Sequence, residues 1–399
     1  MDSVTNGAGP LAGIVVADFS RVLAGPLATM TLADLGARVI KVEMPGAGDD
    51  TRSWGPPFSE TGSTYFDSVN RNKESVCLNL ADRGTANDPG GDNALARTLA
   101  ARADVVIENF KPGGMAKLGL GYSDIVALNP GVIYVSISGF GSSGGADLPG
   151  YDFMVQAVGG LMSITGDAEG EPSKTGVAVV DILTAKDATI GILAALHARH
   201  ATGRGAHLEV NLLSSLQGSL ANQAQAYLGA GLVPTRMGNA HPSIAPYELL
   251  ACADTSLAIA CGNDGQFRKL AQALGIPDAA TDERFATNTA RVRNRPSLVT
   301  LLEQRLCTQT AQHWQGILTA VGVPAGKVGT IADGIALAET LGLNPTIDVH
   351  NPEGEVTARQ VRHPVLWQPP FEARTEAPPL LGQHSEAVKR WLSTDNPEA

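Results

Sequence analysis

The chain has 399 residues, of which 43% are hydrophobic and 17% are charged, and its formal net charge is -11. This composition is typical of a globular protein with room for two domains, and it excludes fibrous and disordered proteins. The negative charge disfavours nucleic acid and anionic membranes as partners, so an anionic ligand would need a local cluster of basic side chains.

Residues 1–13 have neither the basic-then-apolar layout of a secretion signal nor the Arg-rich amphipathic layout of a mitochondrial presequence. No run of residues approaches the ~20 apolar residues that span a bilayer, and we therefore expect a cytoplasmic protein. The cysteines form no CxxC pair, which predicts buried free thiols in place of disulfides or a thiolate zinc site. These cysteines are Cys77, Cys252, Cys261 and Cys307.

Short apolar runs alternate with helical patterns from residue 13 to residue 140. The runs rich in valine and isoleucine predict strands, and the segments between them predict helices, the first with a proline in its first turn and a glycine at its end. The expected strands are 13–20, 37–43, 75–80, 104–110 and 131–140, and the expected helices are 26–36 and 93–103. This pattern predicts an α/β fold, a doubly wound domain with a parallel sheet.

The second half of the chain predicts a smaller α+β unit. A long helix is expected from Ile182 to about Ala201, followed by a strand and another helix within 207–231. A hairpin that turns at 253–256 and several short helices follow, and residues 363–388, rich in proline, are expected to pack back on the first domain. The expected division is a large domain over 1–230, a small domain over 231–330, and a linker with a C-terminal return over 331–399.

Two motifs suggest cofactor or metal sites and are better explained otherwise. The stretch GFGSSG at 139–144 fits GxGxxG after a strand, but a loop with a proline follows where a nicotinamide site needs a helix. His197 and His200 could share a metal, but a basic helix C-terminus is the commoner explanation. We therefore expect neither a nicotinamide site nor a metal site.

Two polar loops are candidates for contacts with a ligand. Arg71 and Lys73 flank a turn that could hold a phosphate, although their spacing alone favours a solvated surface loop. Asn109, Phe110 and Lys111 follow a predicted strand, where open α/β sheets bind ligands, and could hold an adenine ring and a phosphate. The alternative is a loop that only leads into a helix. Together the two loops suggest a phosphorylated ligand with an aromatic group.

Asp181 follows the apolar run 177–180, where an unpaired carboxylate is rare. Spacing and composition favour a helix N-cap, which is worth ~1 kcal/mol. The same setting suits a nucleophile, because helix amides and the helix dipole would keep the carboxylate ionised at pH 7 without a general base. Apolar neighbours would also keep water away from a reactive acyl intermediate.

Seven segments in series resemble class III CoA-transferases, the formyl-CoA transferase and carnitine CoA-transferase type. The resemblance runs in order from about residue 10 to residue 386, and a series of segments is far more specific than any single one. The resemblance is strongest to the succinyl-CoA:dicarboxylate branch, which includes the succinate–hydroxymethylglutarate (glutarate) enzyme. The short sequences that carry it are RVLAGP, PGAGDDTR, WGPPF and VNRNK. The segments are 18–58, 70–80, 106–122, 150–166, 175–185, 238–248 and 378–386.

The resemblance implies a Rossmann-like large domain, a smaller α+β domain, and an interlocked homodimer of two ring-shaped subunits. It implies that Asp181 attacks the acyl-CoA thioester and that the reaction passes through an aspartyl-acyl anhydride and an aspartyl-CoA thioester. The expected donor is succinyl-CoA or a similar thioester, and the expected acceptor is a small carboxylic acid with a second carboxylate. Coenzyme A is a co-substrate, and no metal or other cofactor is expected.

Further site residues carry over from the same resemblance. The expected CoA contacts are Val22, Ala24, Arg71, Asn72, Lys73, Asn109, Phe110 and Lys117. A second carboxylate on the acceptor would need a cation, for which Arg236 and His241, and further Arg21, are candidates. The alternative for Arg236 and His241 is a surface or interdomain salt bridge.

Three departures from the family pattern bear on the activity. Met44 stands where some formyl-CoA transferases carry a basic residue, so one phosphate contact is expected to be absent. Residues 238–248 replace the polyglycine loop of those enzymes, so formyl or oxalyl specificity is not expected. Tyr151 stands where the related racemases carry a histidine, and a tyrosine with a pKa of ~10 is a poor base. This favours a transferase, with an acyl-CoA racemase or isomerase, or a non-catalytic acyl-CoA-binding dimer, as the alternatives.

Overall fold

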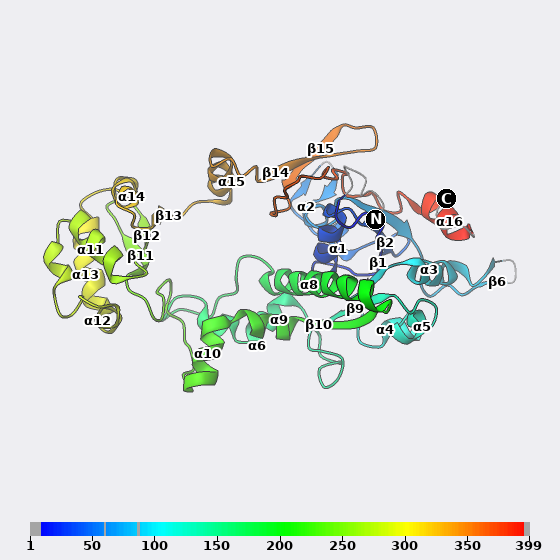
Figure 1. Ribbon diagram of the computed structural model, residues 1–399, viewed down its shortest axis with the longest axis horizontal. Coiled ribbons are helices and arrows are strands. Elements are labelled where there is room, and N and C mark those ends of the chain that lie inside the picture. The colour runs from blue at the N-terminus through cyan, green and yellow to red at the C-terminus, as the bar shows by residue number, and fades with distance from the viewer. Residues whose placement is uncertain (1–8, 60, 86–87, 395–399) are drawn as a thin grey trace. The chain divides into compact units, whose positions relative to one another are not determined.

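The computed structural model describes residues 9–59, 61–85 and 88–394, and these fall into two compact units. The large unit comprises the described parts of residues 1–159, 175–225 and 344–399, and the small unit comprises 160–174 and 226–343. Figure 1 shows the elements of both. The small unit thus includes residues 160–174, which precede the long helix. The order of elements in the sequence does not indicate that this segment belongs to the small unit.

A parallel sheet forms the centre of the large unit, as the sequence predicts. Its strands are β1 (Val15–Asp18), β2 (Arg38–Glu43), β5 (Lys73–Cys77), β8 (Val105–Glu108), β9 (Ile133–Ser138) and β10 (Ala206–Asn211). They lie in the order β10-β9-β8-β1-β2-β5, and every neighbouring pair is parallel. The predicted α/β fold with a parallel sheet is therefore confirmed.

Helices pack on the sheet because its strands carry apolar side chains on both faces. Val105, Val106 and Ile107 of β8 have no exposed surface, which is typical of a strand in a covered parallel sheet. Helices α1 (Ala24–Asp34) and α8 (Val179–Thr202) lie against each other, and α1 contacts β1 and β2 while α8 contacts β9 and β10 (Figure 1). Helices α3 (Gly91–Arg102) and α16 (Ser385–Ser393) share a second core with Val106.

The strand order reverses between β1 and β8. Beginning at β1, the chain first builds β2 and β5 on one side, and then β8, β9 and β10 on the other. Ligands of open α/β sheets bind in the crevice at the carboxyl ends of the strands where the order reverses. The segments that follow β1 and β8 are therefore the expected walls of a ligand site.

The C-terminal return covers the edge strand β5. His384 Nδ1 accepts a hydrogen bond from the amide of Ser75 at 3.1 Å, and Ser385 Oγ accepts one from the amide of Cys77 at 3.1 Å. Side chains thus satisfy the free amides of an edge strand, which otherwise invite pairing with another chain. Through these contacts, His384 and Ser385 pack against β5 of the large unit.

The small unit contains the predicted hairpin and one strand that the sequence does not signal. Strands β11 (Tyr247–Ala251) and β12 (Ser256–Ala260) are antiparallel, and β13 (Ala325–Lys327) joins β12. Their core is shared with helices α11 (Asp264–Ala273), α13 (Arg295–Leu306) and α14 (Ala311–Ala320).

Two predictions about local structure need correction. The single helix expected within 207–231 is two helices, α9 (Leu212–Ser219) and α10 (Ala221–Ala230), with Ala221 at a positive φ of 44° between them. Cys252 and Cys261 are buried as predicted, and Cys77 is half-buried, but Cys307 is exposed. Among the described helices, none is both long enough and apolar enough to cross a membrane.

The remaining elements are short. They are β3 (Phe58–Ser59), β4 (Gly62–Ser63), β6 (Gly84–Thr85), β7 (Asp88–Pro89), β14 (Thr346–His350) and β15 (Val356–Val361), the 3-10 turns Asp50–Ser53 and Pro277–Ala280, and the helices α2 (Thr64–Asp67), α4 (Gly114–Lys117), α5 (Tyr122–Val126), α6 (Asp152–Val158), α7 (Leu161–Ile164), α12 (Asn288–Arg293) and α15 (Ile331–Thr340).

We predict that replacing Leu392 in α16 by alanine lowers the free energy of unfolding by ~2–5 kcal/mol, because the buried side chain would leave a cavity. Leu392 is 4% exposed, whereas Leu128 of the same unit is 48% exposed, so Leu128→Ala should cost only ~0.5 kcal/mol. Urea unfolding of the two variants checks this. Equal losses would show that α16 does not stabilise the large unit.

Candidate active site

A cavity of about 250 Å³ opens in the large unit where β1, β8 and β9 end. The segments that follow these strands form its wall, together with the first turns of α6 and α8. We call it the carboxylate cavity, because Asp181 lines it. Its lining also includes Arg21, Val22, Ala24, Asn109, Phe110, Lys111, Gly139, Tyr151 and Asp152.

Asp181 is not the N-cap of its helix. Helix α8 begins at Val179, so Asp181 lies within the first turn, and the residue at the N-cap position is Ala178. The cap comes from Asp152, whose Oδ1 accepts hydrogen bonds from the amides of Val180 at 2.7 Å and Asp181 at 3.2 Å. The expected cap role of Asp181 is therefore wrong, because a carboxylate earlier in the chain satisfies the first free amides of the helix.

Asp152 is itself held in place at the start of α6. Its Oδ2 accepts a hydrogen bond from Gln156 Nε2 at 2.6 Å. Gln156 Oε1 in turn accepts one from the amide of Thr175 at 2.9 Å, just before α8. Gln156 is fully buried. This chain of bonds fixes the carboxylate of Asp152 against the helix that carries Asp181.

The environment of Asp181 raises its pKa to about 7, first through burial and second through the negative charge of Asp152. The expectation that helix amides keep this carboxylate ionised without assistance is therefore wrong, because those amides donate to Asp152. Across residues 9–59, 61–85 and 88–394, no cation or hydrogen-bond donor pairs with the Asp181 carboxylate. An unpaired carboxylate with a raised pKa is a typical candidate for a nucleophile or an acid–base group.

Tyr65 is a second titratable group near this carboxylate. Burial raises the pKa of Tyr65 to about 12, and the negative charges of Asp181, Asp152 and Asp49 add to the effect. Its ring packs edge-on against Trp54, with the ring centroids 5.1 Å apart. The Tyr65 hydroxyl therefore stays protonated at neutral pH and can serve as a hydrogen-bond donor.

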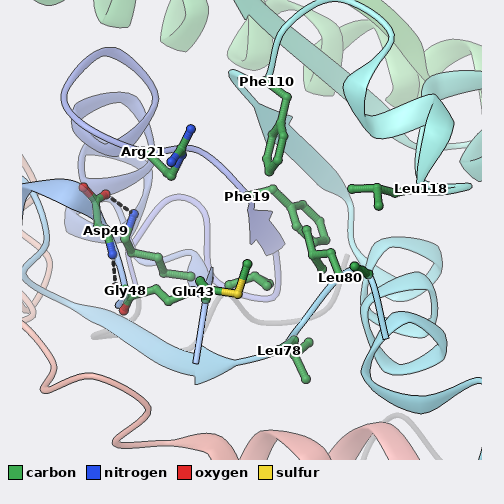
Figure 2. A pocket seen from close by; sticks show the side chains of 13 residues that line it. Phe19, Arg21, Glu43, Gly48, Asp49, Leu78, Leu80, Phe110 and Leu118 are labelled. Carbon is green, nitrogen blue, oxygen red and sulfur yellow. Dashed lines mark hydrogen bonds and ion pairs between the residues drawn. The ribbon is translucent and has the colours of Figure 1, made fainter. Parts of the chain in front are cut away.

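A second cavity, of about 230 Å³, adjoins the first (Figure 2). Arg21 and Phe110 line both cavities. We call it the apolar cavity, because Phe19, Leu78, Leu80, Phe110 and Leu118 form much of its wall. Met44, which departs from the family pattern, also lines it and is 53% exposed.

Seven of the predicted site residues come together in the carboxylate cavity. They are Asp181, Arg21, Val22, Ala24, Asn109, Phe110 and Lys111. The Asn109 side chain joins the two strand ends, since its Oδ1 accepts from the amide of Arg21 at 2.9 Å and its Nδ2 donates to the carbonyl of Arg21 at 2.7 Å. The expectation that ligand-facing residues follow β1 and β8 fits this arrangement.

Arg71, Asn72 and Lys73 are buried in other interactions. Arg71 pairs with Asp34 at 2.6 Å, and Asn72 Nδ2 donates to the same carboxylate at 2.8 Å. Lys73 Nζ lies 3.2 Å from Asp18, and neither side chain has exposed surface. A buried cation that already has a partner is not free to hold a phosphate, so their expected contact with CoA finds no support in this conformation. The expectation of a solvated surface loop is wrong for the same reason.

The predicted cations Lys117, Arg236 and His241 do not line the carboxylate cavity. Lys117 is exposed at the end of α4. In the small unit, Arg236 donates to the carbonyls of Asp167 at 3.1 Å and Gly170 at 2.9 Å. His241 accepts a hydrogen bond from the amide of Ser243 at 3.1 Å. A role for Lys117, Arg236 or His241 toward a ligand stays a prediction.

Sequence reasoning missed Asp152 and Tyr65. The only signal for Asp152 is an acidic residue in the first turn of a helix, which many helices share. His197 and His200 are exposed at the end of α8, and GFGSSG forms the loop after β9 without starting a helix. Within the described residues, no three His, Cys, Asp or Glu side chains are placed to hold a metal ion.

Comparisons with known proteins agree with this geometry. The sequence model of a family described as CoA-transferase family III matches residues 11–385. A succinate–glutarate CoA-transferase of Agrobacterium fabrum is 44% identical over 407 residues, covering 99% of this chain and 98% of that protein. A succinyl-CoA:glutarate CoA-transferase of Mus musculus is 41% identical over 382 residues, covering 95% and 85%. The crystal structure of a CAIB/BAIF family protein from Brucella suis matches with a TM-score of 0.84 and 45% identity, covering 97% of this chain and 100% of that one.

We predict that Asp181→Asn makes the protein more stable at pH 8 than the parent, by at least ~1 kcal/mol. The folded pKa of Asp181, about 7, lies above the unfolded value, so the parent loses stability as pH rises from ~4 through 7. The asparagine variant does not have this loss, and its advantage should shrink at pH 5.

Urea unfolding at pH 5 and pH 8, at one protein concentration, measures the difference. The matched control is Asp187→Asn, on the exposed side of the same helix, which should match the parent at both pH values. An advantage of Asp181→Asn that is equal at pH 5 and pH 8 would contradict the raised pKa.

Proposed function

The chain belongs to CoA-transferase family III, and we propose that it moves CoA from succinyl-CoA to a small dicarboxylic acid through covalent intermediates on Asp181. Relatives named as succinyl-CoA or succinate–glutarate CoA-transferases, at 40% to 44% identity, support this donor and this class of acceptor. The observation that carries the role of Asp181 is its unpaired carboxylate, which lines a cavity and has a pKa of about 7.

In the first half of the proposed reaction, a carboxylate oxygen of Asp181 attacks the thioester carbon of succinyl-CoA. The carbon–sulfur bond breaks, and CoA leaves as a thiolate, so that a mixed anhydride forms. The thiolate then attacks the Asp181 carbon of this anhydride, and succinate leaves as an aspartyl-CoA thioester forms. No proton is gained or lost in these steps, so an ionised aspartate needs no general base.

In the second half, a carboxylate of the acceptor attacks the aspartyl-CoA thioester and forms a new anhydride, again with CoA thiolate as the leaving group. The thiolate attacks the acyl carbon of the acceptor, which releases the new CoA ester and the free Asp181 carboxylate. Both anhydrides are sensitive to water. Asp181 is half-buried, which supports this chemistry because it limits the access of water.

We assign the two adjoining cavities to the two ends of the acyl-CoA. The aromatic and leucine side chains of the apolar cavity suit the adenine ring, and the carboxylate cavity suits the thioester. Phe110 lines both, which supports its predicted contact with CoA. Val22, Ala24 and Asn109 line the carboxylate cavity and stay proposed contacts.

Arg21, Arg236 and His241 are predicted anchors for the distal carboxylate of the acceptor. Of these three, Arg21 lines the same cavity as Asp181. Its guanidinium lies 3.1 Å from Asp50, and both side chains are about half exposed, at 51% and 53%. An exposed ion pair contributes little to stability, so a substrate carboxylate can take the place of Asp50 at low cost. These observations support Arg21 ahead of Arg236 and His241.

We further propose that the large unit is Rossmann-like and that the protein is the interlocked homodimer expected from the family. The order in which the chain builds its sheet supports the first statement. Exposed apolar side chains of the C-terminal return support the second, since such patches are typical of interfaces. They are Val361, Val365, Leu366 and Trp367. The domain limits near residues 230 and 330 and the cytoplasmic location stay predictions.

We predict that Asp181→Ala lowers the rate of CoA transfer from succinyl-CoA to dicarboxylic acids by at least ~10³-fold, because the nucleophile is lost. Mass spectrometry of the CoA esters formed with a panel of acids measures the rate. Asp187→Ala, on the same helix, serves as the control and should keep the parent rate. In the parent incubated with succinyl-CoA, borohydride should reduce the aspartyl-CoA thioester, which releases CoA as a thiol and converts the Asp181 carboxyl group to an alcohol that mass spectrometry detects.

The outcomes separate the alternatives. Exchange of an α-proton without CoA transfer would support the racemase alternative. Binding of acyl-CoA without turnover of either kind would support the non-catalytic one. Transfer that persists in Asp181→Ala would overturn the role of Asp181.

We predict that kcat/KM rises with pH through about 7 in the parent, because Asp181 must be ionised to attack. Asp152→Asn removes a negative charge near Asp181 and keeps an oxygen that can cap α8, so the pKa of Asp181 falls and the acid limb moves to lower pH. The pH–rate profiles of the parent, Asp152→Asn and Asp187→Asn measure this. If the acid limb of the profile lies at the same pH in Asp152→Asn and in the parent, the interaction between Asp152 and Asp181 is contradicted.

A further inference from the structure

The segment Ser20–Val22, which follows β1, lines both cavities and carries backbone strain. Arg21 lines both cavities, and Val22 lines the carboxylate cavity. Val22 has a φ of 73°. This left-handed conformation is unfavourable for a β-branched residue and costs ~1–3 kcal/mol. Such a conformation persists only where the surroundings hold it.

Side chains from distant parts of the chain bind the backbone of this segment. The amide of Val22 donates to both oxygens of Asp49, at 3.3 and 3.2 Å. The carbonyl of Ser20 accepts from Lys41 Nζ at 2.9 Å. The Asn109 side chain binds both the amide and the carbonyl of Arg21. The backbone of each of the three residues in the segment is therefore held by at least one hydrogen bond with a side chain.

Lys41 and Asp49 form an ion pair of 2.8 Å, and neither side chain has exposed surface. Asp49 also accepts from the amide of Thr51 at 3.0 Å and from its hydroxyl at 2.7 Å, and its own amide donates to Glu43 at 3.0 Å (Figure 2). Burial opposes ionisation of Asp49, but Lys41 and Thr51 outweigh it, and its pKa lies below the ordinary value. Asp49 is thus an anchored, charged acceptor for the amide of Val22.

Two unfavourable features meet at this one segment. A buried ion pair is seldom more stabilising than a well-packed apolar pair of similar volume. The strained Val22 also costs stability. Stability alone therefore does not account for either, whereas both fix the same backbone at the junction of the two cavities.

We propose that the buried Lys41–Asp49 pair is a positioning device that holds Ser20–Val22 in the strained conformation and so orients the acyl-CoA thioester toward Asp181. This inference rests on the proposed function. Lys41 and Asp49 line the apolar cavity, but neither side chain has exposed surface, and both bind the backbone of the segment. They are therefore positioning residues.

The first test replaces the charged pair by an apolar one, in the double variant Lys41→Met and Asp49→Leu. Such a replacement of a buried pair is often neutral or stabilising, so the fold should survive. The amide of Val22 loses its acceptor, and we expect kcat/KM for succinyl-CoA to fall ~10- to 100-fold, mainly through kcat, because orientation at the nucleophile is lost. A stable double variant with the parent kcat and KM would overturn the proposal.

The single variant Asp49→Asn guards against misfolding of the double variant. It keeps the size of the side chain, and its rates are divided by the fraction of native protein determined by urea unfolding. We expect a smaller fall in kcat per native molecule than in the double variant, because asparagine keeps one oxygen for the amide of Val22 but loses the ion pair with Lys41. A merely structural role would lower only the native fraction.

Asp104→Asn is the matched control. Asp104 accepts a hydrogen bond from the amide of Val15 at 2.8 Å and forms an ion pair with Arg199 at 2.8 Å. Asp49 makes the same two kinds of contact, with the amide of Val22 and with Lys41. Asp104 lies just before β8, at the end of the sheet opposite the cavities. This variant should lose stability and keep the parent kcat and KM. A parent protein without CoA transfer would instead refute the proposed function and not this inference.

Discussion

Two carboxylates meet at the start of α8, and the hydrogen bonds of the helix go to only one of them. Asp152 accepts the first free amides, at 2.7 and 3.2 Å, and so uses the positive end of the helix for itself. Asp181 is left half-buried, unpaired within the described chain, and beside a negative charge. Had Asp181 been the cap, those amides would have lowered its pKa and weakened it as a nucleophile. The proposed chemistry depends on this division between the two residues.

Three unfavourable features of the large unit lie where the strand order reverses. The raised pKa of Asp181, the positive φ of Val22 and the buried Lys41–Asp49 pair all belong to the walls of the two cavities or support them. In the same unit the strand β8 is wholly buried, and the side chains of His384 and Ser385 accept hydrogen bonds from the amides of the edge strand β5. A protein of marginal stability can hold local strain only if the surrounding structure compensates for it.

The sequence predicted the parallel sheet, its strands and the small-unit hairpin, because runs of valine and isoleucine and the turns between them are local signals. It could not predict contacts between distant residues. Arg71 and Lys73 read as a solvated turn, since nothing nearby in the sequence marks Asp34 and Asp18 as their partners. Asp152 lies in another helix than the one it caps, so the cap was assigned to Asp181. The role of Asp181 itself came from the resemblance to a family and not from its spacing.

The raised pKa of Asp181 has two opposite effects on the proposed reaction. It reduces the ionised fraction below about pH 7. It also makes each ionised carboxylate more basic, and a more basic oxygen attacks a carbonyl faster. The charge that burial and Asp152 disfavour disappears when the anhydride or the aspartyl-CoA thioester forms. The free carboxylate is therefore the unfavourable state, and both covalent intermediates relieve it. In the proposed reaction, both the acylation of Asp181 and the transfer of CoA form an uncharged aspartyl anhydride or thioester. The same interaction would therefore favour the reaction with the donor and with the acceptor.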